Sequence, residues 1–343
     1  MHITAIIPFY NGNDTLPLTL EALTGLERPA DIQLDIIIST DGLDQNPDIS
    51  VGKNLPITVI QDEQRGQSAT TNCGARYARG DLLWLLAQDM VPQPDALTRL
   101  FARYNQFYNP LIQGFIEHNP EDLADPFVQH VLDSGLQFTY GNVSNPDQLD
   151  PGLHYAPHAL VRRDAFLMLG GYDEQLPYGM QDTDLGLRWR LNGRRIVLAR
   201  DSVVIHHHRY RFSAYREREE KIGAALVSMF IKWRKEAYLN RYLMTQQVFS
   251  QSLGPDIAVA QQIGEQWELT GQIPPGNGGF KGPLTVPGDA LKSAFLITMS
   301  WARVEGVRVA LDELGMLDHL PPLPKGFDPQ KDHPTQWIRE MAG

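Results

Sequence analysis

Short runs of β-branched and apolar residues alternate with helix-like patterns through the first 115 residues, and this alternation restricts the fold more than any other feature. It is typical of parallel strands joined by crossover helices. We therefore expect an α/β protein with a Rossmann-like, doubly wound and mostly parallel sheet. The predicted strands cover residues 3–8, 34–39, 57–61, 82–86 and 111–115, and the predicted helices cover residues 14–26, 68–78 and 94–107, with Pro94 in a first helical turn.

Polar residues follow three of these strands at the point where each strand ends. They are Pro8 to Asn11, Thr40 to Gly42, and Ala87 to Asp89. In open α/β sheets, ligands bind outside the carboxyl ends of the strands. Asp41 and Asp89 are therefore expected to converge on one crevice, although 48 residues separate them. A single Asp after a strand is also a common turn or capping residue, so it is the convergence that suggests a site.

The pattern changes twice beyond residue 115. Residues 116–212 are irregular and rich in Asp, His and Gly, whereas residues 213–343 are mainly helical. A Pro/Gly-rich loop at 273–288 precedes a further predicted helix near 290–314, and a proline-rich, extended tail is expected after it. We therefore expect three parts, 1–115, 116–212 and 213–343. One apolar helix face is predicted to pack into the core; it consists of Ile222, Leu226, Met229, Phe230 and Trp233.

Five short motifs follow one another in an order that resembles the family 2 glycosyltransferases, inverting enzymes of the GT-A fold. The resemblance covers about residues 3–235. It implies transfer of a sugar, with inversion, from a nucleotide-diphosphate sugar to an acceptor hydroxyl in cell-surface polysaccharide or glycoconjugate synthesis. The motifs are Pro8-Phe9-Tyr10-Asn11, Thr40-Asp41-Gly42, the helix from Gly66 to Gly74, Ala87-Gln88-Asp89, and Gln181-Asp182-Thr183-Asp184 after a Gly-Gly-Tyr-Asp turn.

The resemblance also implies roles for individual residues. Asp182 is the expected catalytic base, and a divalent cation, Mn²⁺ or Mg²⁺, is expected on Asp89 and His206. Alternate side chains at the end of a strand share a face, so His206 and His208 should point together and His207 away. Surface histidines, and acidic residues favoured at a helix start, are the alternatives for these positions. The nucleotide sugar is expected to contact Pro8, Tyr10, Asp41, Arg65, Asn72 and Gln88.

Three positions depart from the family pattern, because Thr40, Ala87 and Gln181 replace acidic residues. Fewer carboxylates should weaken cation binding, and a neutral Gln181 leaves Asp182 without a like-charged neighbour to raise its pKa. These losses motivate an alternative, a catalytically degenerate protein of the same fold that binds a nucleotide sugar or glycan. A sugar-phosphate nucleotidyltransferase is a third interpretation, disfavoured because Pro8 to Asn11 is not glycine-rich.

The net charge and the cysteine content of the chain limit which partners it is expected to bind and in which compartment it is expected to work. The formal charge of −11 disfavours nucleic acid as a ligand, and the single cysteine, Cys73, is compatible with a reducing cytoplasm. The sequence suggests neither a signal peptide nor a membrane-spanning helix. From Arg209 to Arg241, nine Lys and Arg accompany four Glu. This segment suggests peripheral contact with the inner membrane face and a glycan or lipid-linked acceptor, the alternative being a solvated helix with i,i+4 ion pairs.

Overall fold

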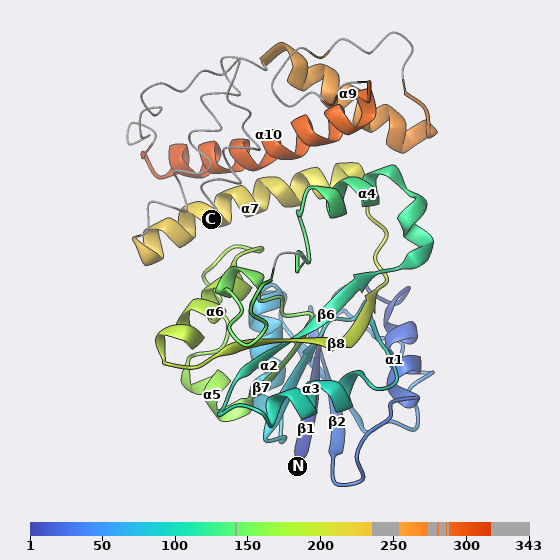
Figure 1. The fold of residues 1–343 in the computed structure, drawn as a ribbon, viewed down its shortest axis with the longest axis vertical. Helices are drawn as coiled ribbons and strands as arrows, with labels where there is room; N and C mark the ends of the chain where they lie inside the picture. The colour runs from blue at the N-terminus through green and yellow to red at the C-terminus, as the bar shows by residue number, and fades with distance from the viewer. Residues whose placement is uncertain (141–142, 235–253, 274–279, 281–285, 287, 317–343) are drawn as a thin grey trace. The chain divides into compact units, whose positions relative to one another are not determined.

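The computed structural model describes residues 1–140, 143–234, 254–273, 280, 286 and 288–316. The chain divides into two compact units (Figure 1). The sheet unit consists of residues 1–123, 135–175 and 181–209. The helical unit consists of residues 124–134, 176–180 and those from 210 onward. The three-part division expected from the sequence stays a prediction, and most of the predicted loop at 273–288 and the whole extended tail from 317 lie outside the described residues.

A single mixed sheet forms the centre of the sheet unit. Its strand order is β3-β2-β1-β4-β7-β6-β8-β5. Neighbours among β1 to β4 pair in parallel, as do β6 and β8, whereas β7 is antiparallel to β4 and β6, and β5 is antiparallel to β8. The mostly parallel α/β sheet expected from the sequence is thus confirmed. The strands are β1 (His2–Phe9), β2 (Gln33–Asp41), β3 (Ile57–Asp62), β4 (Leu82–Leu86), β5 (Met90–Pro92), β6 (Leu111–His118), β7 (His158–Arg162) and β8 (Ile196–His206).

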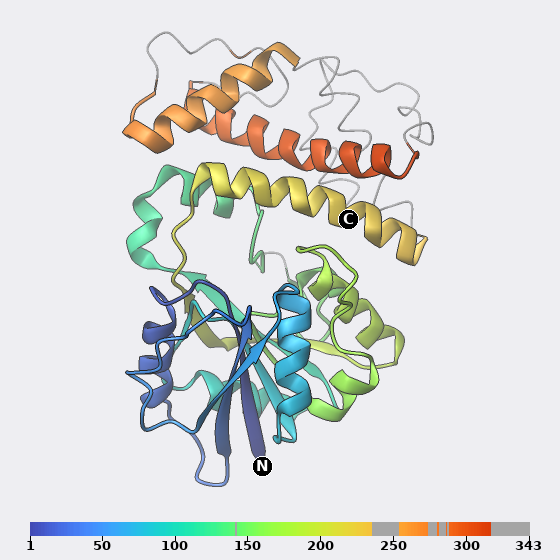
Figure 2. The ribbon, with the colours of Figure 1, turned by 180° about the vertical axis from the view of Figure 1, so that it is seen from behind.

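Helices cover both faces of this sheet. Helix α2 (Gln67–Tyr77) contacts β1 and β2, and α3 (Ala96–Tyr104) contacts β6 and β8. Figure 1 shows α3 in front of the strands and Figure 2 shows α2 on the other side. Coverage on both faces explains why β1 and β4 read as continuous apolar runs. The other helices are α1 (Leu16–Thr24), η1 (Pro120–Ala124), η2 (Pro151–Leu153), α5 (Arg163–Met168) and α6 (Gln181–Leu191).

Two details of the sequence prediction are wrong. Pro94 lies before α3, which begins at Ala96 after Asp95. The segment around β7 was expected to be irregular, but it forms a central strand with four of its five residues buried. Its partners on β4 and β6 lie 46 or more residues earlier in the chain, so the local pattern gave no indication of the pairing.

The helical unit is formed by α4 (Pro126–Asp133), α7 (Phe212–Trp233), α9 (Gly254–Thr270) and α10 (Ala290–Glu313). Its core is aromatic, with ring centroids of Phe127, Phe212, Tyr215 and Phe295 at 5.0–5.7 Å. In the predicted apolar stripe, Ile222, Leu226 and Met229 are buried and the last two members are partly exposed. The predicted helical C-terminal region is confirmed.

Helices α7 and α10 approach each other closely at two glycines. A Cβ atom at Gly223 would lie 2.1 Å from the Arg303 carbonyl oxygen, and one at Gly306 would lie 1.9 Å from the Glu220 carbonyl oxygen. Figure 1 shows the two helices side by side. Next to this crossing, the buried Glu219 carboxylate pairs with both Arg218 and Arg303. None of the described helices is long and apolar enough to cross a membrane.

Candidate active site

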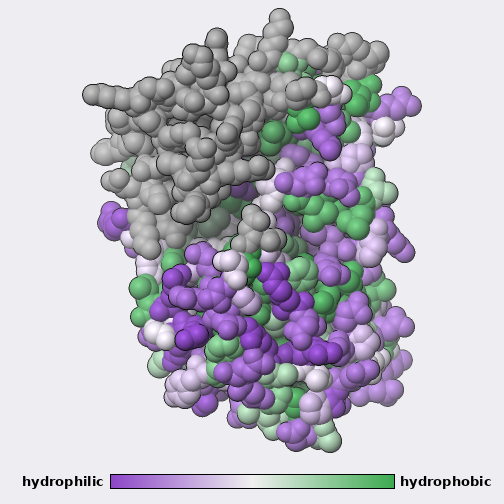
Figure 3. Space-filling view, in the orientation of Figure 1, coloured by the Kyte–Doolittle hydropathy of each residue, from purple (hydrophilic) through white to green (hydrophobic). Residues whose placement is uncertain are grey.

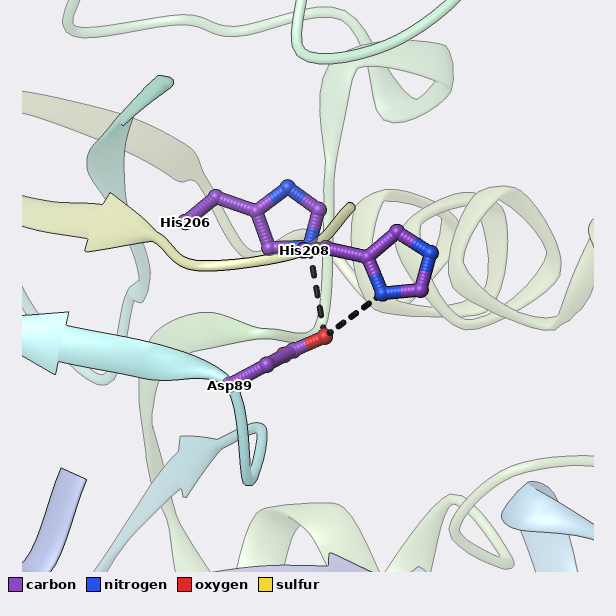
Figure 4. A group of neighbouring side chains, drawn as sticks. All are labelled: Asp89, His206 and His208. Atoms are coloured by element: carbon purple, nitrogen blue, oxygen red, sulfur yellow. Dashed lines mark ion pairs between the residues drawn. The ribbon is translucent and has the colours of Figure 1, made fainter. Parts of the chain in front are cut away.

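One carboxylate and two imidazoles meet at the carboxyl end of the sheet. The His206 Nε2 atom lies 3.3 Å from Asp89 Oδ2, and the His208 Nδ1 atom lies 3.6 Å from the same oxygen (Figure 4). Strand β5 brings them together, because it follows Asp89 directly and pairs Met90 with His206. The amide of His207 also donates to the Asp89 carbonyl oxygen at 2.8 Å.

This group has the composition and spacing of a cation site. Its three ligand atoms lie within 4.8 Å of one another. Nitrogen and oxygen ligands sit about 2.0–2.2 Å from a divalent transition ion, so two ligands of one ion lie up to about 4.2 Å apart. Both contacts to Asp89 fall in that range. Burial opposes the charged carboxyl, but the His206 and His208 imidazoles outweigh it and hold the pKa of Asp89 well below its ordinary value. The Asp89 carboxyl is therefore ionised at neutral pH, as a cation ligand must be.

The turn after β1 is held by Gln88. The Gln88 side-chain oxygen accepts from the Tyr10 amide at 2.9 Å, and its side-chain nitrogen donates to the Tyr10 carbonyl at 3.1 Å. A Cβ atom at Gly12 would lie 2.1 Å from the same side-chain nitrogen, so a larger residue there would displace the Gln88 amide. The side chain of Gln88, predicted to contact the nucleotide sugar, is thus directed at the protein's own main chain. Pro8 lines a pocket beside this turn, and the Tyr10 side chain is 47% exposed.

Asp41 and Arg65 meet at the start of α2. One oxygen of Asp41 accepts from the amides of Arg65 and Gly66, at 2.7 and 2.9 Å. Asp41 thus binds the main chain of the loop that leads into α2, whose first turn it does not cap. A carboxylate has a second oxygen, so these bonds leave Asp41 able to accept another hydrogen bond. The Arg65 guanidinium pairs with Asp62 and with Glu174.

Asn72 lies inside the protein and binds the turn that precedes α6. Its side-chain nitrogen donates to the Tyr172 carbonyl at 2.8 Å, and its side-chain oxygen accepts from the Tyr172 amide at 2.8 Å. Only 4% of Asn72 is exposed. The structure therefore places this predicted nucleotide-sugar contact in a structural link between α2 and the Gly171–Tyr172 turn.

Asp182, in the first turn of α6, carries a carboxyl whose pKa departs strongly from its ordinary value. Burial raises its pKa to about 7, against a smaller opposing effect of the Ala156 main chain and the Tyr172 hydroxyl. The like-charged neighbour missing at Gln181 is thus not needed for a raised pKa. A carboxyl with this pKa changes between acid and base near neutral pH.

A small pocket and an aromatic cluster each have one member next to Asp182 and another next to the cation group. The pocket has a volume of about 10 Å³, room for about one water molecule, and is lined by Pro8, Ala87 and Ala156 among others. Ala156 adjoins Asp182, and Ala87 precedes Asp89 by two residues. The cluster runs from His206 through Phe138 and Tyr155 to Tyr140, with centroid separations of 5.2, 5.3 and 5.5 Å. The Asp182 charge acts on Tyr140, whose hydroxyl pKa is raised by burial first and by nearby Tyr155 and Asp182 second.

The three replaced acids are accounted for by local contacts. Thr40 is fully buried, and its hydroxyl donates to the Gly42 carbonyl at 2.9 Å. Gln181 is buried, and its side-chain nitrogen donates to the Gln67 side chain at 3.4 Å, joining α6 to α2. Ala87 lines the pocket. The pocket region therefore carries less negative charge than the family pattern would give it.

Sequence reasoning missed two residues of this region. His208 was expected to point the same way as His206 but was not assigned to the cation, and its ring stacks on that of His206 at 5.4 Å with an interplanar angle of 7°. The alternation of the His-His-His run was the signal. Tyr172, buried beside Asp182, gave no signal beyond its place in the Gly-Gly-Tyr-Asp turn.

Residues 4–167 match the model of the family described as Glycosyl transferase family 2. A curated relative, the undecaprenyl-phosphate 4-deoxy-4-formamido-L-arabinose transferase of Proteus mirabilis, is 25% identical over 126 residues, which are 35% of this chain. The match spans 38% of that relative's length.

Two solved glycosyltransferase structures share the fold. The mannosyltransferase PcManGT from Pyrobaculum calidifontis, in complex with GDP-Man and Mn²⁺, has a TM-score of 0.51 at 16% identity, with 99% of this chain and 84% of that chain covered. S. aureus TarS 1–349, in complex with UDP-GlcNAc, has a TM-score of 0.51 at 13% identity, with 92% of each chain covered. The five motifs, the family match over residues 4–167 and the GT-A fold thus identify a glycosyl transferase family 2 domain in this chain.

Proposed function

We propose that the protein is an inverting glycosyltransferase that moves a sugar from a nucleotide-diphosphate sugar to an acceptor hydroxyl, in the synthesis of a cell-surface polysaccharide or glycoconjugate. The observation that carries the proposal is Asp182, a carboxyl with a pKa near 7 beside a pocket at the carboxyl ends of β1 and β4. The names of the curated relative and of the two solved structures also support a sugar transfer.

The proposed reaction forms a bond from the acceptor oxygen to the anomeric carbon and breaks the bond to the diphosphate on the opposite face. Asp182 takes the acceptor proton as the oxygen attacks, which requires the ionised carboxylate. Pro8, Tyr10 and the second oxygen of Asp41 form the nucleoside side of the site. Arg65 contributes positive charge, and Asn72 and Gln88 hold the surrounding turns. A divalent cation held by Asp89, His206 and His208 would offset the charge that develops on the leaving diphosphate.

The test is a transfer assay with purified protein, UDP- and GDP-sugars, divalent cation and a panel of glycan and lipid-linked acceptors. Release of nucleoside diphosphate is measured, and the anomeric configuration of the product is read by NMR. We expect the inverted anomer. A product of retained configuration would refute the inverting mechanism, and the lack of transfer to every acceptor would favour a binding protein.

Asp182→Asn and Asp184→Asn form a matched pair on one helix turn. Asp182→Asn should lower kcat by about 10²–10⁴-fold, the range of general base catalysis, while leaving the melting temperature equal or higher, because burial disfavours the charged carboxyl. Asp184 is fully buried and pairs with Arg188 at 2.7 Å. Asp184→Asn should therefore lower the melting temperature. Equal kcat in wild type and Asp182→Asn would remove Asp182 as the base.

The pH dependence follows from the same carboxyl. Because burial raises the pKa of Asp182 to about 7, the base is available above that pH and is lost as pH falls through it. We expect kcat to decline tenfold per pH unit on the acidic side, with a midpoint near 7. The residual activity of Asp182→Asn should lack this decline. A wild-type profile that is flat from pH 8 to 5 would contradict the assignment.

The non-catalytic alternative rested on the three replaced acids, and the chain keeps both a base candidate and a cation-type group despite them. The proposal also covers the acceptor and the location. The acceptor is a hydroxyl of a glycan or of a lipid-linked molecule, and the transfer takes place in the cytoplasm at the inner membrane face. The printed name of the curated relative supports a lipid-phosphate acceptor.

The charges on the protein surface determine how it could contact a membrane. Arg216 and Arg218 in the basic segment pair with Glu265 and Glu219. The face of the sheet unit visible in Figure 3 is mainly hydrophilic. Contact with lipid would then depend on charge, so binding to anionic vesicles at low salt that is lost at moderate salt is the expected result. No binding at low salt would exclude it.

A further inference from the structure

A second pocket lies at the amino ends of the strands, at the opposite edge of the sheet from the candidate active site. Its volume is about 420 Å³, within the range of small-molecule sites. Leu82, the first residue of β4, lines it, whereas Asp89 follows the other end of that strand. Met1 lines it too, so the letter N in Figure 1 marks the same edge. We call it the amino-edge pocket; its charged side chains are Arg79, Asp81, Arg162, Arg163 and Asp164.

Main-chain hydrogen bonds join the segments that form this pocket. The Asp81 amide donates to the His2 carbonyl at 2.8 Å, and the Arg163 amide donates to the Asp81 carbonyl at 3.0 Å. Gly80 packs closely on β1, where a Cβ atom would lie 2.6 Å from the Thr4 amide nitrogen. The beginnings of β1, β4 and α5 are thus held together. A ligand would meet walls that are already formed, which lowers the entropy cost of binding.

Two arginines of the pocket have no carboxylate partner within the described residues. The Arg163 guanidinium is held in place, because its Nε and Nη2 atoms donate to the Ala75 and Arg76 carbonyls at 3.2 and 3.1 Å. These bonds leave its Nη1 atom available. The side chain of Arg79 is exposed and forms no hydrogen bond or ion pair with any residue that the structure describes.

The carboxylates of the pocket do not cancel this charge. Asp164 pairs with Arg162 at 2.7 Å and accepts from the Ala165 amide at 2.6 Å, so its charge is already compensated. Asp81 accepts from the His2 amide at 3.2 Å through one oxygen, which leaves the other oxygen available. The pocket therefore has a net positive charge in a chain whose formal charge is −11.

We propose that the amino-edge pocket binds a phosphomonoester, with Arg79 and Arg163 on the phosphate group. Guanidinium groups suit this ligand, because their planar N–H donors match the phosphate oxygens and keep their charge at any physiological pH. A phosphate fills only part of the pocket, and the second oxygen of Asp81 can accept from a hydroxyl on the rest of the ligand. The phosphate belongs to a small free molecule or to a lipid headgroup. The proposed sugar transfer does not use this pocket.

The experiment titrates glycerol 3-phosphate, and glycerol as its uncharged counterpart, into the full chain by calorimetry. We expect one molecule of glycerol 3-phosphate to bind and glycerol to give no signal. Arg79→Ala should weaken binding by about tenfold or more, the range for a lost hydrogen bond to a charged group. The control is Arg99→Ala, which removes an arginine that is 51% exposed and pairs with Asp95 outside the pocket. It should bind as wild type does, and melting curves check that both variants fold.

A further variant separates this pocket from the nucleotide side of the candidate active site. Arg65→Ala should leave the affinity for glycerol 3-phosphate unchanged. A loss in Arg65→Ala without a loss in Arg79→Ala would place the ligand at the other edge of the sheet and overturn the proposal. Equal affinity in Arg79→Ala and wild type would also overturn it. Labelling with phenylglyoxal gives a second readout, since glycerol 3-phosphate should protect Arg79 and leave Arg99 reactive.

Flotation with phosphatidylcholine vesicles, with and without phosphatidic acid, distinguishes the two sources of the phosphate. Flotation that needs phosphatidic acid and is lost in Arg79→Ala identifies a lipid headgroup. Binding of glycerol 3-phosphate without flotation identifies a small free ligand. The proposal fails if glycerol 3-phosphate does not bind and flotation is absent or persists in Arg79→Ala. Because none of these readouts involves a sugar donor, the pocket and the proposed sugar transfer can fail independently.

Discussion

At the scale of single residues, Gln88 stands out because both ends of its amide bind the main chain of Tyr10. It lies next to Asp89, so it joins the turn that follows β1 to the proposed carboxylate ligand of the cation. We regard Gln88 as a positioning residue. Its hydrogen bonds fix main-chain atoms of the turn, and its own side chain is not free to contact a ligand.

Replacing Gln88 should therefore affect donor binding more than cation binding. In Gln88→Glu the bond from the side chain to the Tyr10 carbonyl is lost and two oxygens face each other. Loss of one or two hydrogen bonds, each about 1 kcal/mol, should raise KM for the donor about 5–30-fold. The Kd for Mn²⁺ should change less than threefold. The control is Gln93→Glu, at an exposed position on the same segment. A fall in kcat with unchanged KM would contradict a positioning role.

The sequence allowed part of the site to be predicted. The pairing of Asp89 with His206 was implied by the resemblance to family 2 glycosyltransferases, and the structure brings the two side chains together. The role of Asn72 could not be predicted, because its partner, Tyr172, lies 100 residues away in an irregular segment. The pKa of Asp182 could not be predicted either. Its cause is burial, which depends on how distant segments pack.

At the scale of helices and strands, the crossing of α7 and α10 depends on two glycines. Gly306→Ala should lower the free energy of unfolding by about 1–3 kcal/mol, because the new methyl group would meet the rigid Glu220 main chain at 1.9 Å. Gly25→Ala is the control, since its methyl group would meet nothing closer than 3.7 Å. Urea unfolding of both variants checks this. Equal stability of Gly306→Ala and wild type would show that the helices can separate without cost.

The strands show where local pattern suffices for prediction. The parallel strands β1, β2 and β4 are buried on both faces and were visible as apolar runs. Strand β5 has only three residues, too few for any periodicity. It could be recognised only through its antiparallel partner β8, yet it is the element that sets Asp89 against His206.

At the scale of the whole molecule, buried histidines link stability to pH. Burial lowers the pKa of His130 to about 4, and of His154 and His158 to about 3. Unfolded histidine takes up a proton below about pH 6.5, whereas the folded protein does not until the lower values. The stability from these groups is therefore complete above pH 6.5 and is lost as pH falls toward 4. The raised pKa of Asp182 makes its contribution to stability grow as pH falls. It therefore offsets the contribution of about one of these three histidines.

We expect the free energy of unfolding to fall by a few kcal/mol between pH 7 and pH 5, on the order of 2 kcal/mol per uncompensated histidine. Urea unfolding at intervals of half a pH unit measures this slope. His154→Gln should reduce this slope by the equivalent of up to one proton, because its folded-state pKa is lowered by burial. Stability that is constant or rising from pH 7 to 5 would contradict the expected sign.

The helical unit gathers segments from three places in the chain, and this limits how the protein can be shortened. Phe127, in the first of those segments, is fully buried against Phe212, Tyr215 and Phe295, all of which come after residue 209. A chain that ends near residue 210 would lose these contacts, so Phe127 would be exposed to solvent. The shortened protein would then carry an exposed aromatic surface that promotes aggregation. A minimal catalytic fragment will therefore need either the later helices or a polar redesign of residues 124–134.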